Sequence, residues 1–138
     1  QLVLPAMKAN KWGRILMVGA SAVSQPIPAN VISNIYRTGL AQYCKTLAGD
    51  VIKEGITVNV VSPAAVLTNR TRTTAAKAAG KKGIDVSDEL ANREAGLPSG
   101  RFGKPQEFGA MVAFLASEQA GYSTGGNWRV DGGMVKAL

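Results

Sequence analysis

Two short, continuous apolar runs flank one long segment with helical periodicity, and this pattern constrains the fold more than any other feature. The runs are residues 15–18 and 56–61. Continuous rather than alternating apolarity is typical of strands buried on both faces, as in a parallel sheet covered by helices. Between the runs, apolar residues of segment 29–53 recur every three to four positions, and Gly55 follows as a helix stop. This order predicts a parallel, right-handed βαβ unit.

The remaining segments predict further elements of an α/β fold. Residues 1–10 suggest a helix ending, and residues 128–130 a last short strand. A helix should open with Pro105, since proline suits the first turn. Segment 64–104 is looser: it contains a possible helix at 87–94 and a basic, alanine-rich stretch.

Composition excludes several classes of chemistry. The 138 residues suit one domain and contain no histidine and one cysteine, Cys44, on the apolar side of the long helix. Histidine-dependent nucleophilic catalysis and multi-cysteine zinc sites are therefore excluded, and no metal is expected. No apolar stretch has the length of a membrane span, and residues 1–5 do not resemble a signal peptide. A cytoplasmic protein is expected.

Several short motifs, taken in order, resemble the C-terminal half of the short-chain dehydrogenase/reductase family. They are Gly13-Arg14-Ile15, Ile56-Thr57-Val58-Asn59 with Ser62-Pro63, Arg101-Phe102-Gly103-Lys104-Pro105-Gln106-Glu107, Thr124-Gly125-Gly126 and Val130-Asp131-Gly132-Gly133. The resemblance implies an oxidoreductase that uses NAD or NADP and acts on a small alcohol or carbonyl substrate.

The family's glycine-rich phosphate loop is absent from this sequence. In that loop, backbone N–H groups and a helix N-terminus hold the cofactor pyrophosphate. We therefore expect residues 1–138 to form a single partial domain, the C-terminal portion of a Rossmann-like doubly wound parallel sheet, with segment 64–104 as its variable substrate loop. The isolated chain is expected to be a truncated, inactive fragment.

The catalytic positions implied by the resemblance also differ from the family pattern. Where the family has a strand-end Ser and Tyr-x-x-x-Lys, this chain has Ala20, Ser33 and Arg37, with Ser21 as a neighbouring hydroxyl. Some bacterial members resemble this Ser-Asn-x-x-Arg pattern. A serine hydroxyl is a weaker acid than a phenol, and arginine cannot relay a proton. Ser33 and Arg37 are either catalytic or a polar helix face, and Ser21 either orients substrate or caps the strand end.

The resemblance assigns nicotinamide contacts to Pro63, Val66 and Thr68, with Arg37 as a donor to ribose or phosphate oxygens. In this turn Ala64 replaces the usual glycine, which matters if the position needs a positive φ. For Thr68, a helix cap is an equal alternative.

Partners are suggested by charge and by exposed apolar residues. The net charge is +7, and the segment from Arg70 to Lys82 contains no acid. That segment could attract an anionic substrate, although a mobile, solvated loop is the favoured interpretation. Nucleic-acid and membrane binding are not expected. The resemblance implies a homo-oligomer, with Val31, Ile35, Leu40 and Trp128 as interface candidates. The alternative function is a non-catalytic module for oligomerisation or for binding anionic partners.

Overall fold

A three-stranded parallel sheet forms the centre of the protein in a computed structural model that describes residues 2–28 and 30–137. The strands are β1 (Gly13–Val18), β2 (Ile56–Pro63) and β3 (Asn127–Val130), in the order β1-β2-β3. Gly13 pairs with Ile56 at one end of the β1–β2 ladder and Val18 with Val61 at the other. The predicted parallel βαβ unit is confirmed.

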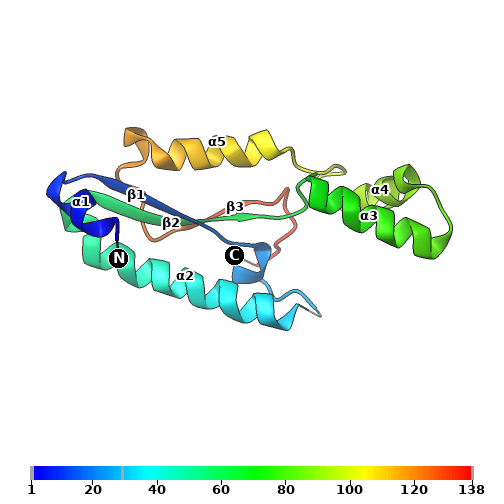
Figure 1. The fold of residues 1–138 in the computed structure, drawn as a ribbon, viewed down its shortest axis with the longest axis horizontal. Coiled ribbons are helices and arrows are strands. Elements are labelled where there is room, and N and C mark those ends of the chain that lie inside the picture. The colour runs from blue at the N-terminus through cyan, green and yellow to red at the C-terminus, as the bar shows by residue number, and fades with distance from the viewer. Residues whose placement is uncertain (1, 29, 138) are drawn as a thin grey trace.

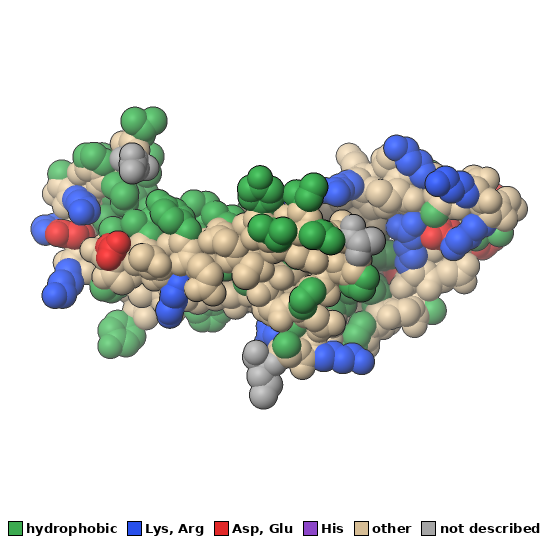
Figure 2. Space-filling view, turned by 90° about the horizontal axis from the view of Figure 1, so that it is seen from below, with side chains coloured by type: hydrophobic (Ala, Val, Ile, Leu, Met, Phe, Trp, Pro, Cys, Tyr) green, Lys and Arg blue, Asp and Glu red, His purple; other side chains and the backbone are tan. Residues whose placement is uncertain are grey.

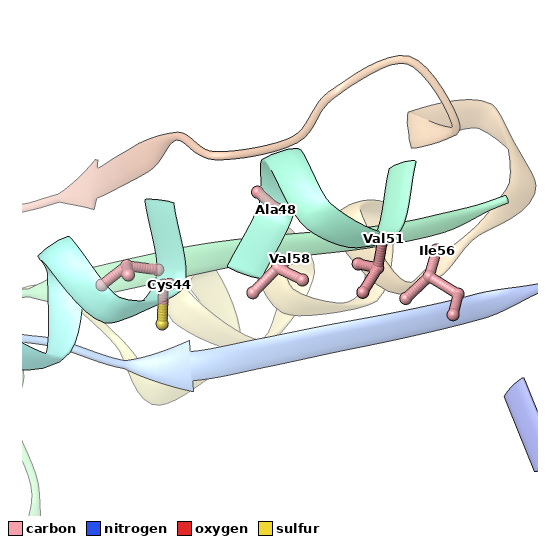
Figure 3. Packing of buried hydrophobic residues seen from close by; sticks show 6 residues of the cluster. Cys44, Ala48, Val51, Ile56 and Val58 are labelled. Carbon is pink, nitrogen blue, oxygen red and sulfur yellow. The ribbon is translucent and has the colours of Figure 1, made fainter. Parts of the chain in front are cut away.

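Helices cover both faces of this sheet (Figure 1). The long helix α2 (Val31–Val51) lies on one face and α5 (Pro105–Ala116) on the other. Ile56, Val58 and Val60 of β2 pack toward α2, whereas Val61 packs toward α5. Figure 3 shows the α2 side of the core, where Cys44, Ala48 and Val51 lie against Val58 and Ile56. Alternating residues of β2 therefore serve two separate apolar layers.

Burial differs between the two predicted core strands. All residues of β2 except Pro63 are buried, whereas most of β1 is half-buried and Val18 is 53% exposed. The cause is position, because β2 is central and β1 is an edge strand among the described residues. The prediction of burial on both faces is thus confirmed for β2 and only partly for β1.

Short helices and turns complete this layer arrangement. They are α1 (Leu4–Ala9), η1 (Ser21–Val23), η2 (Ile52–Glu54) and η3 (Glu118–Ala120). Gly55 ends η2 with φ of 73°, and a Cβ there would lie 2.1 Å from the Lys11 carbonyl oxygen. Only glycine fits this stop. Pro105 is the first residue of α5, as predicted, and Glu107 accepts a hydrogen bond from the Lys104 backbone N–H.

Asn59 connects the centre of the sheet to the approach to β3. Its side chain is fully buried, and its Nδ2 donates to the Ser123 carbonyl at 2.7 Å. Its Oδ1 accepts from the Gly126 N–H at 3.1 Å and from Trp128 Nε1 at 3.0 Å. One amide therefore satisfies two groups of the turn-rich segment that leads into β3 and one group of β3 itself.

The basic segment predicted as a mobile loop is instead a helix, and segment 64–104 contains two helices. These are α3 (Asn69–Lys82) and α4 (Val86–Ala95), which form a hairpin extending beyond the end of the sheet (Figure 1). The alanine-rich composition favours a helix, and Gly83 ends α3 with φ of 65°. Buried Glu89 of α4 binds Lys82 of α3 at 2.7 Å and Arg93 at 2.8 Å. These interactions order the segment.

Among the described residues, no helix combines the length and apolarity needed to cross a bilayer. The predicted helix start at residue 29 lies outside the described residues, as do residues 1 and 138.

Candidate functional site

The carboxyl ends of β1 and β2 lie side by side and define the candidate site. The Gly19 N–H donates to the Val61 carbonyl at 2.8 Å, so the two strands remain paired to the end of β1. Two connections leave from this edge, one leading into η1 and the other into α3. In open α/β sheets, ligands bind at this carboxyl edge.

Ser33 and Arg37 lie on the α2 face that is turned toward this edge. At 100° per residue they share the line of Cys44, Ala48 and Val51, which are buried against the sheet. The Arg37 Nη1 donates to the Val18 carbonyl at the last residue of β1. Because β1 ends there, this part of the helix line has polar rather than apolar residues. The structure therefore gives Arg37 a contact with backbone, beside the strand end.

Neighbouring residues hold the start of α2 in place. The Asn34 Nδ2 donates to the Ile27 carbonyl at 3.0 Å, and its Oδ1 accepts from the Ile27 N–H at 3.2 Å. Tyr36 is 75% exposed. It is therefore not turned toward the site, consistent with its offset of ~100° from Arg37.

Ser21 lines a cavity of about 180 Å³ that the sequence did not predict. Its other lining residues come from the following loop and from the C-terminal tail: Gln25, Pro26, Ile27, Pro28, Met134 and Val135. The Lys136 N–H donates to Gln25 Oε1 at 3.1 Å and thereby holds the tail against the loop. Ser33 lies elsewhere, in a shallow hollow formed by the first turn of α2. The structure thus brings Ser21 and Ser33 to the same edge but not into one cavity.

The turn from Pro63 to Thr68 leaves β2 at this edge. Thr68 caps α3, its Oγ1 accepting from the Thr71 N–H at 3.3 Å. The Val66 carbonyl accepts from the Thr68 N–H at 3.0 Å and from Thr71 Oγ1 at 2.7 Å. The positive φ of 48° falls on Ala65, not on Ala64, so alanine in place of the family's glycine at position 64 causes no backbone strain at that position. The cap alternative for Thr68 is observed.

A second cavity, of about 250 Å³, adjoins the same turn on its β3 side. It is lined by Ala64, Ala65, Ser99, Arg101, Gly103, Glu107, Arg129, Val130, Asp131 and Gly132. Arg101 binds Glu107 through two hydrogen bonds, at 2.6 and 2.9 Å. The Arg101 guanidinium, followed by the Lys104 backbone N–H, lowers the pKa of Glu107 to about 2. Arg129 donates to the Ala137 carbonyl at 2.6 Å. The Arg101 motif was recognised in the sequence, but its place beside the turn was not.

The residues present fit only one end of a nicotinamide dinucleotide. The turn from Pro63 to Thr68 offers backbone and hydroxyl groups at the carboxyl edge, where a carboxamide could bind. No glycine-rich strand-to-helix turn that could hold a pyrophosphate occurs among residues 2–28 and 30–137. Within the same residues, no three His, Cys, Asp or Glu side chains are grouped so as to hold a metal ion.

Known proteins are similar to this chain in sequence and in fold. The family described as enoyl-(acyl carrier protein) reductase matches residues 1–135. A D-beta-hydroxybutyrate dehydrogenase from Cupriavidus necator is 37% identical, over 98% of this chain and 53% of that protein. The chain spans about half the length of the curated relatives it matches.

Solved structures agree. An L-sorbose reductase from Gluconobacter frateurii, in complex with NADPH and L-sorbose, superposes with a TM-score of 0.92 at 35% identity, over 98% of this chain and 52% of that one. An NADPH-bound short-chain oxidoreductase from Pseudomonas aeruginosa, described as having an atypical catalytic centre, gives 0.82 at 27% identity, over 98% and 51%. From its motifs, its parallel βαβ core and these matches, the chain belongs to the short-chain dehydrogenase/reductase family.

Proposed function

We propose that this chain forms the substrate and nicotinamide side of an NAD(P)-dependent oxidoreductase acting on a small alcohol or carbonyl compound. The observation that carries the proposal is the alignment of Ser33 and Arg37 on the inward line of α2, with Arg37 bonded to the end of β1 beside Ser21. These are the positions where the family has its catalytic groups. The relatives named above, a hydroxybutyrate dehydrogenase and a sorbose reductase, support this class of substrate.

The side chains at these positions support binding and orientation rather than proton relay. A bound nicotinamide would give or take a hydride at the substrate carbon. The hydroxyl of Ser21 or that of Ser33, which lie in separate hollows, can donate a hydrogen bond to a carbonyl oxygen. Arg37 remains protonated and already donates to the Val18 carbonyl, so it fixes geometry without passing on a proton. The isolated chain is therefore proposed to be inactive.

The cavity beside Ser21 supports a substrate with a small apolar part. Proline, isoleucine, methionine and valine side chains supply most of its wall, and about 180 Å³ is below the usual range of drug-sized pockets. No carboxylate lines this cavity within the described part of the chain. A compact, uncharged alcohol or ketone fits that environment better than a cationic one.

Titration with reduced nicotinamide mononucleotide tests the proposal, because this ligand contains the nicotinamide end without the pyrophosphate. In NMR spectra of the chain, we expect weak binding with shifts at the amides of Val66 and Thr68. An Arg37→Gln variant should weaken the shifts, and a Lys53→Gln variant, exposed at the other end of the βαβ unit, should not. Shifts absent from the Val66 and Thr68 amides would refute the assignment.

Calorimetry with NADH and NADPH addresses the proposed inactivity. Neither dinucleotide should bind tightly, because residues 2–28 and 30–137 offer no glycine-rich turn for the pyrophosphate. Tight binding, or consumption of reduced cofactor that depends on an added carbonyl compound, would show that the isolated chain is a working enzyme.

We also infer a homo-oligomer that pairs through the outer face of α2. Val31, Ile32, Ile35 and Tyr36, in the first turns of α2, are 65–75% exposed. Figure 2 views the molecule from the side of α2 and shows apolar side chains gathered near its centre. Leu40 and Trp128, the other sequence candidates, instead pack against the core. A cytoplasmic location remains part of the proposal, since the single cysteine suits a reducing compartment.

Sedimentation should show a concentration-dependent dimer that Ile32→Glu with Ile35→Glu disrupts. A monomer at every concentration would contradict the pairing.

A further inference from the structure

Helix α3 has a row of positive side chains on the side opposite to its packed face. Its 14 residues include five lysines or arginines and no acid. Arg70, Lys77 and Lys81 lie within about 40° of one another around the helix axis, at 100° per residue. Ala75 and Ala79, which are buried, lie on the other side. We call Arg70, Lys77 and Lys81 the cationic row.

The charges of the cationic row are not neutralised within the described part of the chain. The ion pairs there join Lys11 to Glu54, Lys82 to Glu89, Arg93 to Glu89 and Arg101 to Glu107. No member of the row takes part, and all three are exposed. Figure 2 shows basic side chains gathered over the end of the molecule formed by α3 and α4. The row therefore presents three solvated, free cations.

The row borders a shallow hollow that a partner could enter. Thr74, Lys77, Ala78 and Lys81 line about 270 Å³ on this side of the helix. Ala78 is small, so a second backbone can approach the helix closely beside the two lysines. The Thr74 carbonyl and hydroxyl accept from Arg93 at 3.2 Å, and this contact anchors the floor of the hollow to α4. A fixed helix rather than a loop thus keeps the three cations at constant spacings.

We propose that the cationic row is a docking surface for an acidic protein, in particular for a helix whose carboxylates are spaced four and seven residues apart. From Arg70 to Lys81 the row extends about 16 Å at 1.5 Å per residue, which matches three turns of a facing helix. The complementary charge on the partner would speed its association and select it against basic surfaces. This surface goes beyond the proposed function and does not depend on turnover.

Two other kinds of anion fit the surface less well. A small phosphate compound needs donors that converge on one point, whereas these cations are spread along the helix and exposed. A nucleic acid would meet the exposed Asp85 and Asp88 on the same hairpin, and residues 69–95 contain no aromatic side chain on which bases could stack. A protein partner with mixed charges avoids both difficulties.

The test uses the 138-residue chain and a fluorescent helical peptide with glutamates at that spacing, followed by anisotropy. Binding should weaken as salt is added and should disappear when the glutamates are replaced by glutamines. Lys77→Gln with Lys81→Gln should reduce affinity about tenfold, the effect of losing two exposed ion pairs. Arg72→Gln is the matched control, because Arg72 is exposed on the same helix but lies about 160° from Arg70.

A charge swap gives a second, independent result. Lys77→Glu with Lys81→Glu should lose the glutamate peptide and bind a lysine peptide of the same spacing. Circular dichroism of each variant checks that α3 remains helical.

Three outcomes would overturn the proposal. The first is that the glutamine peptide binds as tightly as the glutamate peptide. The second is that the double lysine variant and the Arg72→Gln control lose the same affinity. The third is that inorganic phosphate or duplex DNA displaces the labelled peptide at a lower concentration than unlabelled peptide does. Peptide binding without nicotinamide binding would leave the docking surface standing and refute the proposed function. Nicotinamide binding without peptide binding would refute the docking surface and leave the proposed function standing.

Discussion

Replacing Asn59 by leucine should destabilise the fold more than any exposed substitution, because one buried amide connects β2 to the segment before β3. Leucine has a similar size and shape, so the change removes hydrogen bonds without opening a large cavity. The Ser123 carbonyl, the Gly126 N–H and the Trp128 indole N–H each lose a partner, at present 2.7, 3.1 and 3.0 Å away.

The expected loss follows from the number of groups left unpaired. A buried polar group without a partner costs about 1–3 kcal/mol. Trp128 is half-buried, so water can partly replace its bond. The added apolar burial of leucine offsets part of the rest. We therefore expect the free energy of unfolding to fall by about 3 kcal/mol, a large share of the stability of a small domain.

Urea unfolding followed by circular dichroism measures this loss. The midpoint should fall while the dependence on urea concentration stays the same, since the surface exposed on unfolding is unchanged. Asn92→Leu on the exposed side of α4 is the matched control and should change stability little. Equal effects of the two substitutions would refute the structural role assigned to Asn59.

Three further predictions concern single residues. Thr57→Val should raise the free energy of unfolding by about 1 kcal/mol, because the buried Thr57 hydroxyl has no hydrogen-bond partner among the described residues; a lower thermal midpoint for the variant would contradict this. Gly55→Ala should destabilise the fold by more than about 1 kcal/mol, because Gly55 has a positive φ and lies close to the Lys11 carbonyl. Its control, Gly49→Ala, lies at an open helical position and should stabilise the fold slightly. Similar denaturation curves for the two variants would count against the turn geometry. Glu107 has its pKa lowered from 4.5 to about 2, so its contribution to stability is present above pH 4.5 and is lost as the pH falls through about 2. Thermal unfolding of the native chain and of Glu107→Gln should therefore differ at neutral pH and converge near pH 2, and a constant difference would exclude the ion pair as the cause.

The sequence predicted a helix, strand or turn correctly where its signal lies within a few neighbouring residues. The β-branched run of β2, the helical spacing of α2, the stop at Gly55 and the helix start at Pro105 were predicted because each is encoded within a few residues. The prediction of a mobile loop for the basic segment was wrong because this segment has little hydrophobic periodicity and yet is helical. Helix α3 buries only alanines on its packed face, although its helix-forming composition and its cap at Thr68 were present in the sequence.

The candidate site was also predicted only in part from the sequence. The i, i+4 spacing places Ser33 and Arg37 on one side of a helix from the sequence alone. The contact of Arg37 with the Val18 carbonyl could not be predicted, since it depends on where β1 ends against α2. The cavity at Ser21 also escaped prediction because Met134 and Val135 reach it from more than a hundred residues away.

By itself, the sequence determined the α/β class, the parallel βαβ unit and the family, and it led to the hypothesis that Ser33 and Arg37 stand where the family has Tyr-x-x-x-Lys. These properties depend on residue type and short-range spacing, which dictate strand and helix formation directly. The tertiary structure alone decided that Asn59 joins β2 to the approach to β3, that Met134 and Val135 of the C-terminal tail line the cavity at Ser21, and that Lys82 of α3 pairs with buried Glu89 of α4. Such features arise from contacts between distant segments, and only the packing of helices on both faces of the sheet brings those segments together.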